Sequence, residues 1–521
     1  MKKSLQKRKA GVLLHISSLP NADFGEDAYR FLDFLGQIGA SVWQTLPLNV
    51  PMSDGSPYQC LSAHAGNPSF ISMQQLAKVN LLSKADLTDY LNNPTMSHKQ
   101  LLLAKSYESL SQDIESIAYK DYKKFCRKHA SWLNKFAIFS ILREQYQQTS
   151  WNNWPKIYKH CETQTFNLLK KQHATVINVI KFTQFIFFSQ WLALKKAANL
   201  KGIAMFGDIP IFVAFDSADV WANPHLFKLD KNCNMKVVAG VPPDYFSATG
   251  QRWGNPHYSW QAMKSDDFKW WLNRMATQNS LFDMVRIDHF RGLESAWEIP
   301  ATNETAMQGT WVLAPGAALL SAIKQRFKKM CLVAEDLGII TDEVNALRNE
   351  YGLPGMKILQ FAFGGGDDNG YLPHNIELNS VVYTGTHDND TSLGWYFSLD
   401  SHTKNHLHRV LANETPNMPD DLINMALKSS ANLAIIPMQD IMGLDSSCRM
   451  NTPGTMGQNW LWRFEWVQLS VQQISHIKNA IAVANRSSKH PLFKKNLDQK
   501  NASPKSAVLV NSGSEMPVHA A

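Results

Sequence analysis

Short runs of apolar residues recur along the chain, and most of them are near-continuous rather than alternating. A strand buried on both faces has this pattern, whereas a strand with one solvent face alternates apolar and polar residues. Amphipathic stretches that suit helices lie between several runs, at 29–38, 318–329 and 342–350. The runs are Val12–Leu14, Val42–Leu46, Ile203–Val213, Phe282–Ile287, Cys331–Ala334, Lys357–Phe361, Val381–Thr384 and Leu433–Met438. Eight strands with helical crossovers predict an α/β fold, the (β/α)8 TIM barrel.

Two intervals between the predicted strands are too long for one crossover helix. The first, about 75–200, contains several helical patterns, so we expect a helical insertion domain after the second strand. The second, about 214–267, is rich in Gly, Pro and aromatic residues with little periodicity, which is typical of long loops around a binding site. We therefore expect a catalytic barrel over 1–485 that is interrupted twice, followed by a disordered tail over 486–521.

Composition excludes several classes of partner. The chain is 44% hydrophobic and 18% charged, as expected for a globular enzyme. Its net charge of +8 comes largely from the two ends and from "YKDYKKFCRKH", and no stripe of Arg and aromatic residues suggests nucleic-acid binding. The apolar run Val12–Leu14 is too short for a signal sequence, and no run of about 18 apolar residues suggests a membrane span. The six scattered cysteines, without a CxxC pair, favour free thiols in the cytoplasm.

Three acidic residues stand at the ends of predicted strands: Asp288 in "FDMVRIDHFRG", Glu335 in "CLVAEDLG" and Asp388 in "VVYTGTHDND". Barrel enzymes place their sites at the carboxyl ends of the strands, so we expect these three side chains to meet in one pocket. Cleavage of a glycosidic bond uses a pair of carboxyl groups, and a third group could hold the distorted sugar ring. The pattern therefore predicts sugar-bond chemistry.

Asp288 has an arginine two residues before it. Because strand residues alternate in direction, Arg286 and Asp288 project to the same side. An arginine beside a carboxylate lowers the pKa of that carboxyl and keeps it ionised, as a nucleophile requires. Taken alone, a structural salt bridge at the barrel rim explains this pair equally well.

Glu335 has the surroundings of a proton donor. The adjacent Asp336 and an apolar wall from Val333 would both raise the pKa of Glu335. A carboxyl group protonated near neutral pH can give its proton to a leaving oxygen. Glu335 could instead cap the following helix, but Asp336 is the better candidate for a cap, which leaves Glu335 for the pocket.

His387 and Asp388 could bind two neighbouring hydroxyls of one sugar and keep its ring twisted. The rival interpretation is a metal site, because His387 is followed by Asp388, Asn389 and Asp390. A second His or Cys at a defined spacing is missing, so we predict neither a metal nor another cofactor.

Further strings make a resemblance specific. "GDIPIFV", "RIDHFRG", "VAEDLG" and "THDND" resemble the four signature regions of the α-amylase clan. "SPYQCLSAHAGNP", "VAGVPPDYFSATGQRWGNPHYSW" and "PMQDIMGLDSSCRMNTPGTMGQNWLWR" are similar to the amylomaltases, the disproportionating 4-α-glucanotransferases of glycoside hydrolase family 77. The resemblance runs from about Val12 to Phe464, which is nearly the whole chain short of its tail.

The resemblance implies a role for each matching position. Asp288 falls at the nucleophile of the family, Glu335 at its acid/base and Asp388 at its transition-state stabiliser. The matching substrate-binding positions are Tyr58, which stacks on a sugar ring, Asp208, a donor-side contact, Trp253, in a loop that covers the cleft, and Arg286 and His387, at the cleavage point.

Two departures from the family pattern concern acceptor preference and the binding of long glucans. Ala248 stands where the family has a glutamate in "SETGQRW", and "PMSDG" replaces an aromatic residue of a remote glucan site. We expect Tyr245, Phe246 and Trp253 to form a lid that excludes water.

The implied activity is transfer of α-1,4-glucan segments between maltooligosaccharides, by double displacement through a covalent glucosyl-aspartate. The alternatives are a hydrolase of the same clan and a non-catalytic glucan-binding barrel. We expect a monomer or a weak homo-oligomer.

Overall fold

The computed structural model describes residues 7–160, 162–243 and 247–488. Eight parallel strands form one sheet in the order β10-β11-β12-β1-β2-β3-β6-β9. The Ala334 N–H donates to the Pro354 carbonyl just before β10, at 2.9 Å, so the sheet closes into a barrel. The strands are β1 (Lys9–Leu13), β2 (Val42–Gln44), β3 (Ala204–Pro210), β6 (Met284–Asp288), β9 (Cys331–Ala334), β10 (Gly355–Ile358), β11 (Ser380–Tyr383) and β12 (Leu433–Pro437). Each overlaps one predicted run, so the predicted (β/α)8 barrel is confirmed.

The barrel interior is filled by alternate residues of every strand. Leu13, Val42, Phe206, Met284, Val333, Met356, Val381 and Leu433 belong to this inner cluster. The residues between them pack outward against helices, which explains why the strand sequences are near-continuously apolar. Two residues beyond Phe206 and Met284, the inward positions are occupied by Asp208 and Arg286. The interior thus changes from apolar to charged toward the carboxyl ends of the strands.

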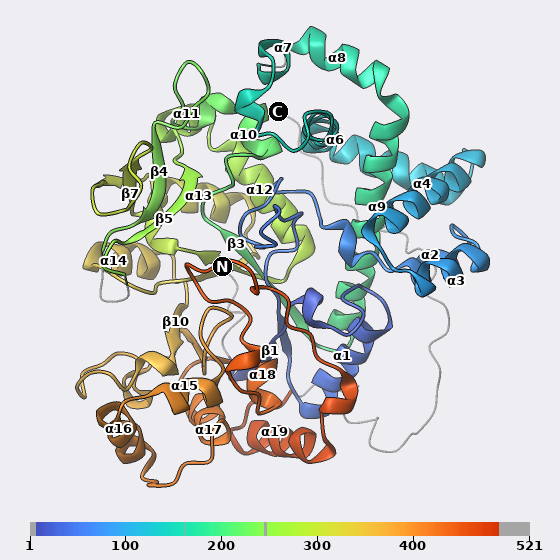
Figure 1. Ribbon diagram of the computed structural model, residues 1–521. Coiled ribbons are helices and arrows are strands. Elements are labelled where there is room, and N and C mark those ends of the chain that lie inside the picture. Colours follow the sequence, from blue (N-terminus) through green and yellow to red (C-terminus); the bar gives the residue numbers. More distant parts are fainter. Residues whose placement is uncertain (1–6, 161, 244–246, 489–521) are drawn as a thin grey trace.

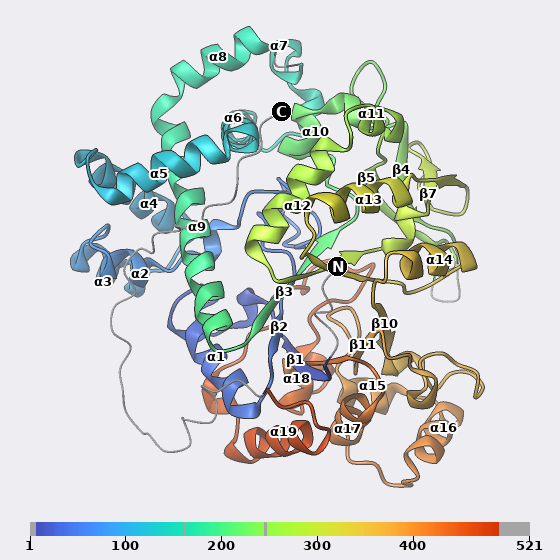
Figure 2. The same ribbon diagram turned by 180° about the vertical axis from the view of Figure 1, so that it is seen from behind.

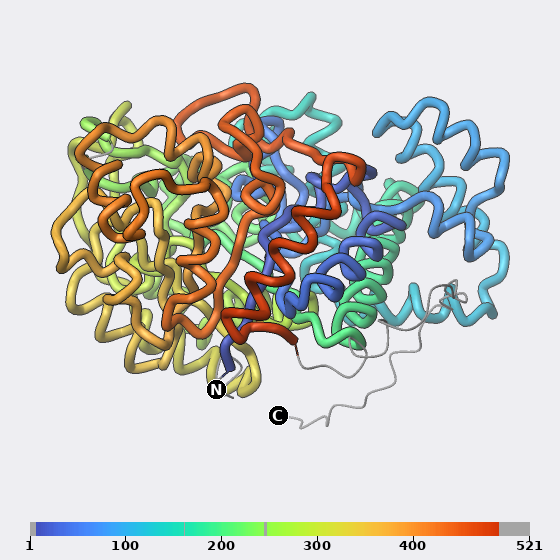
Figure 3. Tube along the Cα trace, turned by 90° about the horizontal axis from the view of Figure 1, so that it is seen from below, coloured from blue at the N-terminus to red at the C-terminus, as the bar shows by residue number. Residues whose placement is uncertain are grey.

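Helix α1 (Glu26–Ile38) shows why the crossover helices form where predicted. Its buried side chains include Ala28, Phe31, Leu32 and Leu35, the spacing of one helical face, and Gly39 ends it with a left-handed φ of 81°. Helices α13 (Gly316–Arg326) and α14 (Asp342–Glu350) lie at the other two predicted stretches. The last helix, α19 (Val471–Val483), packs beside α1, so the two ends of the fold meet (Figure 3).

The helical insertion follows β2, as expected, and lies on one side of the barrel (Figure 1). Its helices are α2 (Met73–Lys78), α3 (Lys84–Asn92), α4 (Met96–Gln112), α5 (Ile117–Lys128), α6 (Ala130–Gln145), α7 (Lys156–Lys159), α8 (Thr163–Gln172) and α9 (Ala174–Leu200). Helix α9 also runs along the barrel (Figure 2), where the Trp191 indole donates to the Leu281 carbonyl at 2.8 Å. By length and composition α9 could cross a membrane, but 56% of its most apolar stretch is buried within the protein.

The second insertion contains more regular structure than its composition suggested. Strands β4 (Val237–Val241) and β5 (Gln251–Pro256) pair antiparallel and join β7 (Ser295–Pro300) and β8 (Thr310–Leu313) in a separate sheet. The expectation of an irregular loop over 214–267 is therefore wrong for these segments. β4 completes its pairing with β7, about 60 residues later, and the sequence gives no sign of that distant partner. The insertion also contains the short helices α10 (Ala218–Ala222) and α11 (Trp260–Ser265), and the longer α12 (Lys269–Leu281) follows it and precedes β6.

The folded part also extends past the predicted start of the tail. Arg486 is 1% exposed, and its guanidinium donates to the carbonyls of Leu427, Ser429, Ala431 and Lys9 at 2.6–3.0 Å. Residues 486–488 of the predicted tail are therefore part of the fold, because Arg486 ties the chain after α19 to β1 and to the end of α17 (Asp420–Lys428) and the segment that leads into β12. The remainder of the predicted tail, 489–521, lies outside the described residues.

Candidate active site

Asp288 and Glu335 stand side by side at the ends of neighbouring strands. Ile287 of β6 is in register with Ala334 of β9, so the residues that follow each are level. The loop after β6 folds over Glu335: the Phe290 N–H donates to its carbonyl, and the His289 N–H donates to Oε2 at 2.6 Å. His289 has a left-handed backbone, with φ 53°, which turns its N–H toward this carboxyl. The predicted meeting of these two carboxyl groups is thus built by strand register.

Beneath Asp288 lies a network of buried polar side chains. Arg286 donates through Nε to Asp208 Oδ1 at 2.9 Å and through Nη2 to Asp288 Oδ1 at 2.7 Å. The Tyr58 hydroxyl donates to Asp208 Oδ2 at 2.7 Å and lies 3.2 Å from Arg286 Nη2. Asp208 and Arg286 are register partners on β3 and β6, so the pairing follows from the barrel itself.

This network defines the contacts of Asp208. Its side chain has no exposed surface, and both of its carboxylate oxygens accept hydrogen bonds from Arg286 and Tyr58. The donor-side contact that the family resemblance implies for Asp208 stays a prediction. Asp208 neutralises Arg286 and orients it, and Arg286 in turn holds Asp288.

Glu335 has the electrostatics of a proton donor. Burial raises its pKa to about 7, with a further contribution from Asp336, while Arg286 and the N–H groups of His289 and Leu337 oppose the shift. The predicted direction is confirmed, although burial outweighs the neighbouring carboxylate. Asp336 does not cap a helix: it accepts from Arg348 at 2.6 Å and from the Met356 N–H at 2.7 Å, and Thr341 precedes α14. Asp336 therefore ties β9 to β10 and α14.

Asp288 differs from the expectation. Burial in the cleft raises its pKa well above the usual value, the carboxylates Asp208, Glu335 and Asp388 add to this, and Arg286 opposes it. Arg286 lowers the pKa of Asp288 as predicted, but burial, the largest cause, and the three nearby carboxylates outweigh it, so the expected net lowering is wrong. Asp288 and Glu335 therefore compete for protons, and Arg286, which contacts Asp288, favours the proton on Glu335.

Asp388 lies across from this pair on the turn after β11, and 47% of its side chain is exposed. His387 Nε2 lies 3.4 Å from Asp388 Oδ2, and the His387 ring stacks on Tyr58 with centroids 5.2 Å apart. Burial lowers the pKa of His387, so its ring is neutral near pH 7. The structure therefore brings Tyr58, His387 and Asp388 together, as expected.

The segment after β12 supplies residues that the sequence analysis did not single out. Asn451 donates to Asp388 Oδ1 at 2.6 Å, and Arg449 donates to the Asp388 carbonyl at 2.5 Å. Trp460 packs against both Tyr58 and His387. The one signal for them was their place in the string "CRMNTPGTMGQNW", which follows the last predicted strand.

Trp253 belongs to β5 and reaches the loop after β6. Its indole meets the His289 ring edge to face, with centroids 4.7 Å apart. Gln59, one residue after Tyr58, donates to the Trp253 carbonyl at 3.5 Å and to Asn255 Oδ1 at 3.0 Å. Trp253 therefore contacts His289, whose N–H donates to Glu335, whereas Tyr245 and Phe246 lie outside the described residues.

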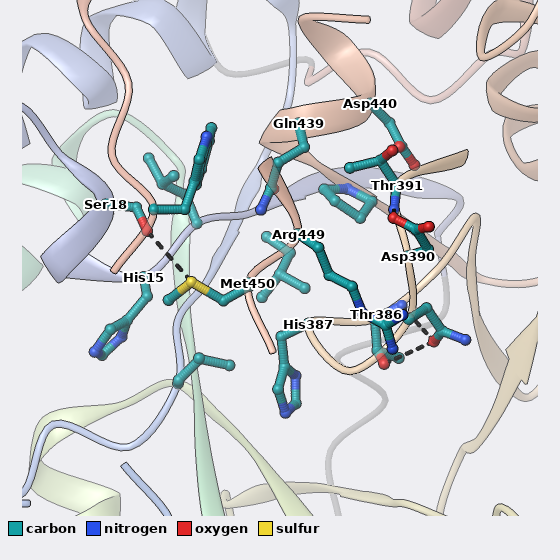
Figure 4. Close-up of a pocket in the computed structure, with 16 residues that line it drawn as sticks. His15, Ser18, Thr386, His387, Asp390, Thr391, Gln439, Asp440, Arg449 and Met450 are labelled. Atoms are coloured by element: carbon teal, nitrogen blue, oxygen red, sulfur yellow. Dashed lines mark hydrogen bonds between the residues drawn. The ribbon is translucent and has the colours of Figure 1, made fainter. Parts of the chain in front are cut away.

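A small cavity adjoins the site on the β1 and β12 side (Figure 4). His15, His387, Gln439, Arg449 and Met450 contribute to its lining, and its volume is about 30 Å³, room for a water molecule or two. None of the three acidic site residues lines it. In the parts of the chain that the structure describes, no three His, Cys, Asp or Glu side chains are grouped to hold a metal ion.

Comparisons with known proteins agree on one family. The sequence model of glycoside hydrolase family 77, described as 4-alpha-glucanotransferase, matches residues 14–470. A 4-alpha-glucanotransferase of Streptococcus pneumoniae is 42% identical over 89% of this chain and 95% of its own, and one of Thermus thermophilus is 42% identical over 90% and 97%. Among solved structures, the amylomaltase of Streptococcus agalactiae in complex with acarbose has a TM-score of 0.87 and 34% identity, covering 92% of this chain and 100% of its own. With the barrel and its acidic cleft in place, these matches show that the chain belongs to glycoside hydrolase family 77 and is an enzyme of the 4-alpha-glucanotransferase type.

Proposed function

We propose that this enzyme moves segments of α-1,4-glucan from a donor maltodextrin to the 4-hydroxyl of an acceptor glucan or glucose, with retention of the α configuration. The observation that carries the mechanism is the level placement of Asp288 and Glu335 on β6 and β9. Neighbouring strands lie about 4.8 Å apart, close to the separation of about 5–5.5 Å between the carboxyl groups of retaining enzymes.

In the first step Glu335 gives its proton to the glycosidic oxygen while Asp288 attacks the anomeric carbon from the opposite face. The C–O bond to the leaving fragment breaks, an ester bond to Asp288 forms, and the fragment departs with a new 4-hydroxyl. The raised pKa of Glu335 supports this role, because the acid form is well populated near pH 7. Asp388 and His387 hold the twisted ring on the other side of the cleft.

In the second step Glu335, now ionised, takes the proton from the 4-hydroxyl of an acceptor sugar. The resulting oxygen attacks the anomeric carbon, and Asp288 leaves as a carboxylate. Two inversions restore the α configuration.

Water competes with the acceptor for the ester at about 55 M, so transfer requires a positioned acceptor; good positioning supplies effective molarities of about 10⁵ M or more. The contact between Trp253 and His289 supports a covering role for the β5 region at this point.

Incubation with maltotriose tests the proposal. Transfer yields glucose together with maltopentaose and a ladder of longer chains, all digestible by an α-specific glucosidase. Glucose and maltose alone would contradict transfer and favour the hydrolase. The Asp288→Asn variant, prepared in parallel, shows whether any product comes from a contaminating enzyme.

The covalent step has its own test. With 5-fluoro-α-glucosyl fluoride, the fluoride leaves without help from an acid, so the Glu335→Gln variant should form the ester and release it slowly. Mass spectrometry should then find one added fluoroglucosyl group on the peptide that contains Asp288. Labelling of a different residue, or of none, would overturn the assignment of the nucleophile.

A further inference from the structure

Asp388 needs an external restraint more than the other two carboxylates do. Glu335 directly follows a strand and Asp288 ends one, whereas Asp388 stands on a turn and keeps 47% of its side chain exposed. Within the turn, Thr386 and Asn389 bond to each other, and the Asp388 N–H has only a long contact, 3.3 Å, to Thr386 Oγ1. These contacts fix the backbone of the turn, whereas within the turn the carboxylate itself has only the 3.4 Å approach of His387 Nε2 to Oδ2.

The restraint comes from the segment after β12. Asn451 Nδ2 donates to Asp388 Oδ1 at 2.6 Å, and the Asn451 N–H donates to the His387 carbonyl at 3.1 Å. Arg449 Nη2 donates to the Asp388 carbonyl at 2.5 Å, and Arg449 Nε donates to the Asn451 carbonyl at 2.8 Å. Figure 4 shows the Arg449 side chain reaching toward the loop that carries Thr386 and His387. Three of these bonds join the two donor residues to the His387–Asp388 pair, and the fourth joins Arg449 to Asn451.

The segment is itself anchored. Met450, between the two donor residues, is 5% exposed and belongs to the cluster that fills the barrel interior. The Trp460 N–H donates to the Met450 carbonyl at 2.8 Å and closes the loop 451–459 at its base. With Met450 held inside the barrel, Arg449 and Asn451 have a fixed base from which to reach Asp388.

We propose that Arg449 and Asn451 are positioning residues of the reaction: together they fix the Asp388 carboxylate against the twisted sugar. Because Asn451 occupies Oδ1, Oδ2 remains beside His387, available to the sugar. Supporting residues of this kind typically change activity by about 10–100-fold when removed. If Arg449 and Asn451 only held the loop in place, their removal would lower stability without a specific loss of kcat. Measuring kcat and KM of the variants distinguishes the two roles.

The inference rests on the proposed function, since its readout is the turnover of maltotriose. We expect Asn451→Ala to lower kcat by about 10–100-fold with KM within about threefold of wild type. The matched control is Thr455→Ala, which removes a hydroxyl bond to the Thr452 carbonyl in the same loop without touching the turn. It should stay within about twofold of wild type. Wild-type protein without transfer would refute the function; active wild type with an equally active Asn451→Ala refutes only the inference.

Asn451→Asp separates positioning from loop structure. The change keeps the shape of the side chain but puts a second carboxylate against Asp388 Oδ1. At pH 8 the two charges repel, whereas at pH 5 one shared proton restores a donated hydrogen bond. The ratio of variant to wild-type kcat should therefore rise at least several-fold as pH falls from 8 to 5. A ratio that is constant with pH would overturn the proposal, even if Asn451→Ala proved unstable.

Discussion

Asp288 and Glu335 belong to two neighbouring strands of the barrel, whereas Asp388 stands on a turn five residues beyond the end of β11. The first side of the cleft is fixed by the register of β3, β6 and β9 and by the buried pair of Asp208 and Arg286. The second side depends on side-chain hydrogen bonds from the segment after β12. The geometry of the first side is set by the barrel strands, whereas the geometry of the second side is set by contacts with a segment that is distant in the sequence.

We call the side formed by β3, β6 and β9 the strand-built side, and the side that carries Asp388 the loop-built side. Removal of the proposed nucleophile, Asp288, should give the largest effect on activity and leave the rest of the strand-built side intact. Asp288→Asn keeps the shape but cannot form the ester, so we expect kcat with maltotriose to fall by about 10⁴-fold or more. Circular dichroism should match wild type. Turnover close to wild type would show that Asp288 is not the nucleophile, and the contrast between the two sides of the site would then lose its functional meaning.

Asp208→Asn tests the buried support of the same side. Arg286 would lose its buried countercharge, so we expect the protein to lose about 1–3 kcal/mol of unfolding free energy, and kcat to fall by about 10²-fold as Asp288 shifts. KM should change little, because Asp208 has no surface in the cleft. A large rise in KM with unchanged kcat would instead place Asp208 against the sugar, as the family resemblance had implied.

The pH dependence of the acid/base is a smaller effect. Since the acid form of Glu335 is required and its pKa is about 7, kcat/KM should fall by about tenfold per pH unit above pH 7. Glu335→Gln should be far less active, and its kcat/KM should no longer fall as pH rises above 7. If kcat/KM of the variant still fell above pH 7 as in wild type, a group other than Glu335 would be responsible for the pH dependence.

The same shift predicts a change in stability. The folded-state pKa of Glu335 lies above its ordinary value of 4.5, so its contribution to stability is present below pH 4.5 and is lost as pH rises through 7. Glu335→Gln should therefore melt about 1–3 °C above wild type at pH 8, and at the same temperature at pH 4. If Glu335→Gln were less stable than wild type at pH 8, burial of the ionised Glu335 carboxylate would not destabilise the folded protein, contrary to the prediction.

The strand-built side was predictable from the sequence because its information is local. "MVRID" and "CLVA" are short buried strings, and a carboxylate just beyond such a string comes to the rim of the barrel. The role of Asp208 was not predictable in this way, since its burial depends on which neighbour meets it across β3 and β6. The raised pKa of Asp288 likewise reflects its burial, and after that the carboxylates of Asp208, Glu335 and Asp388, which come from other parts of the chain.

The loop-built side left weaker signals. Arg449 and Asn451 lie about 60 residues from Asp388, and nothing in their own neighbourhood indicates that their hydrogen bonds converge there. The sheet of β4, β5, β7 and β8 was missed for a related reason: its central pairing, β4 with β7, joins segments about 60 residues apart, and its edge strands β5 and β8 are only partly buried.

Arg486 carries a consequence for biosynthesis. Its guanidinium bridges the Lys9 carbonyl of β1 and the residues that lead into β12, while β1 and β12 pair along their whole length. During synthesis on the ribosome, the helices of the insertion can form early. The barrel cannot be closed and fastened by Arg486 until almost every residue of the folded part has been translated. Stop codons shortly before position 486 should therefore yield protein that chaperones retain, although Asp288, Glu335 and Asp388 are already present.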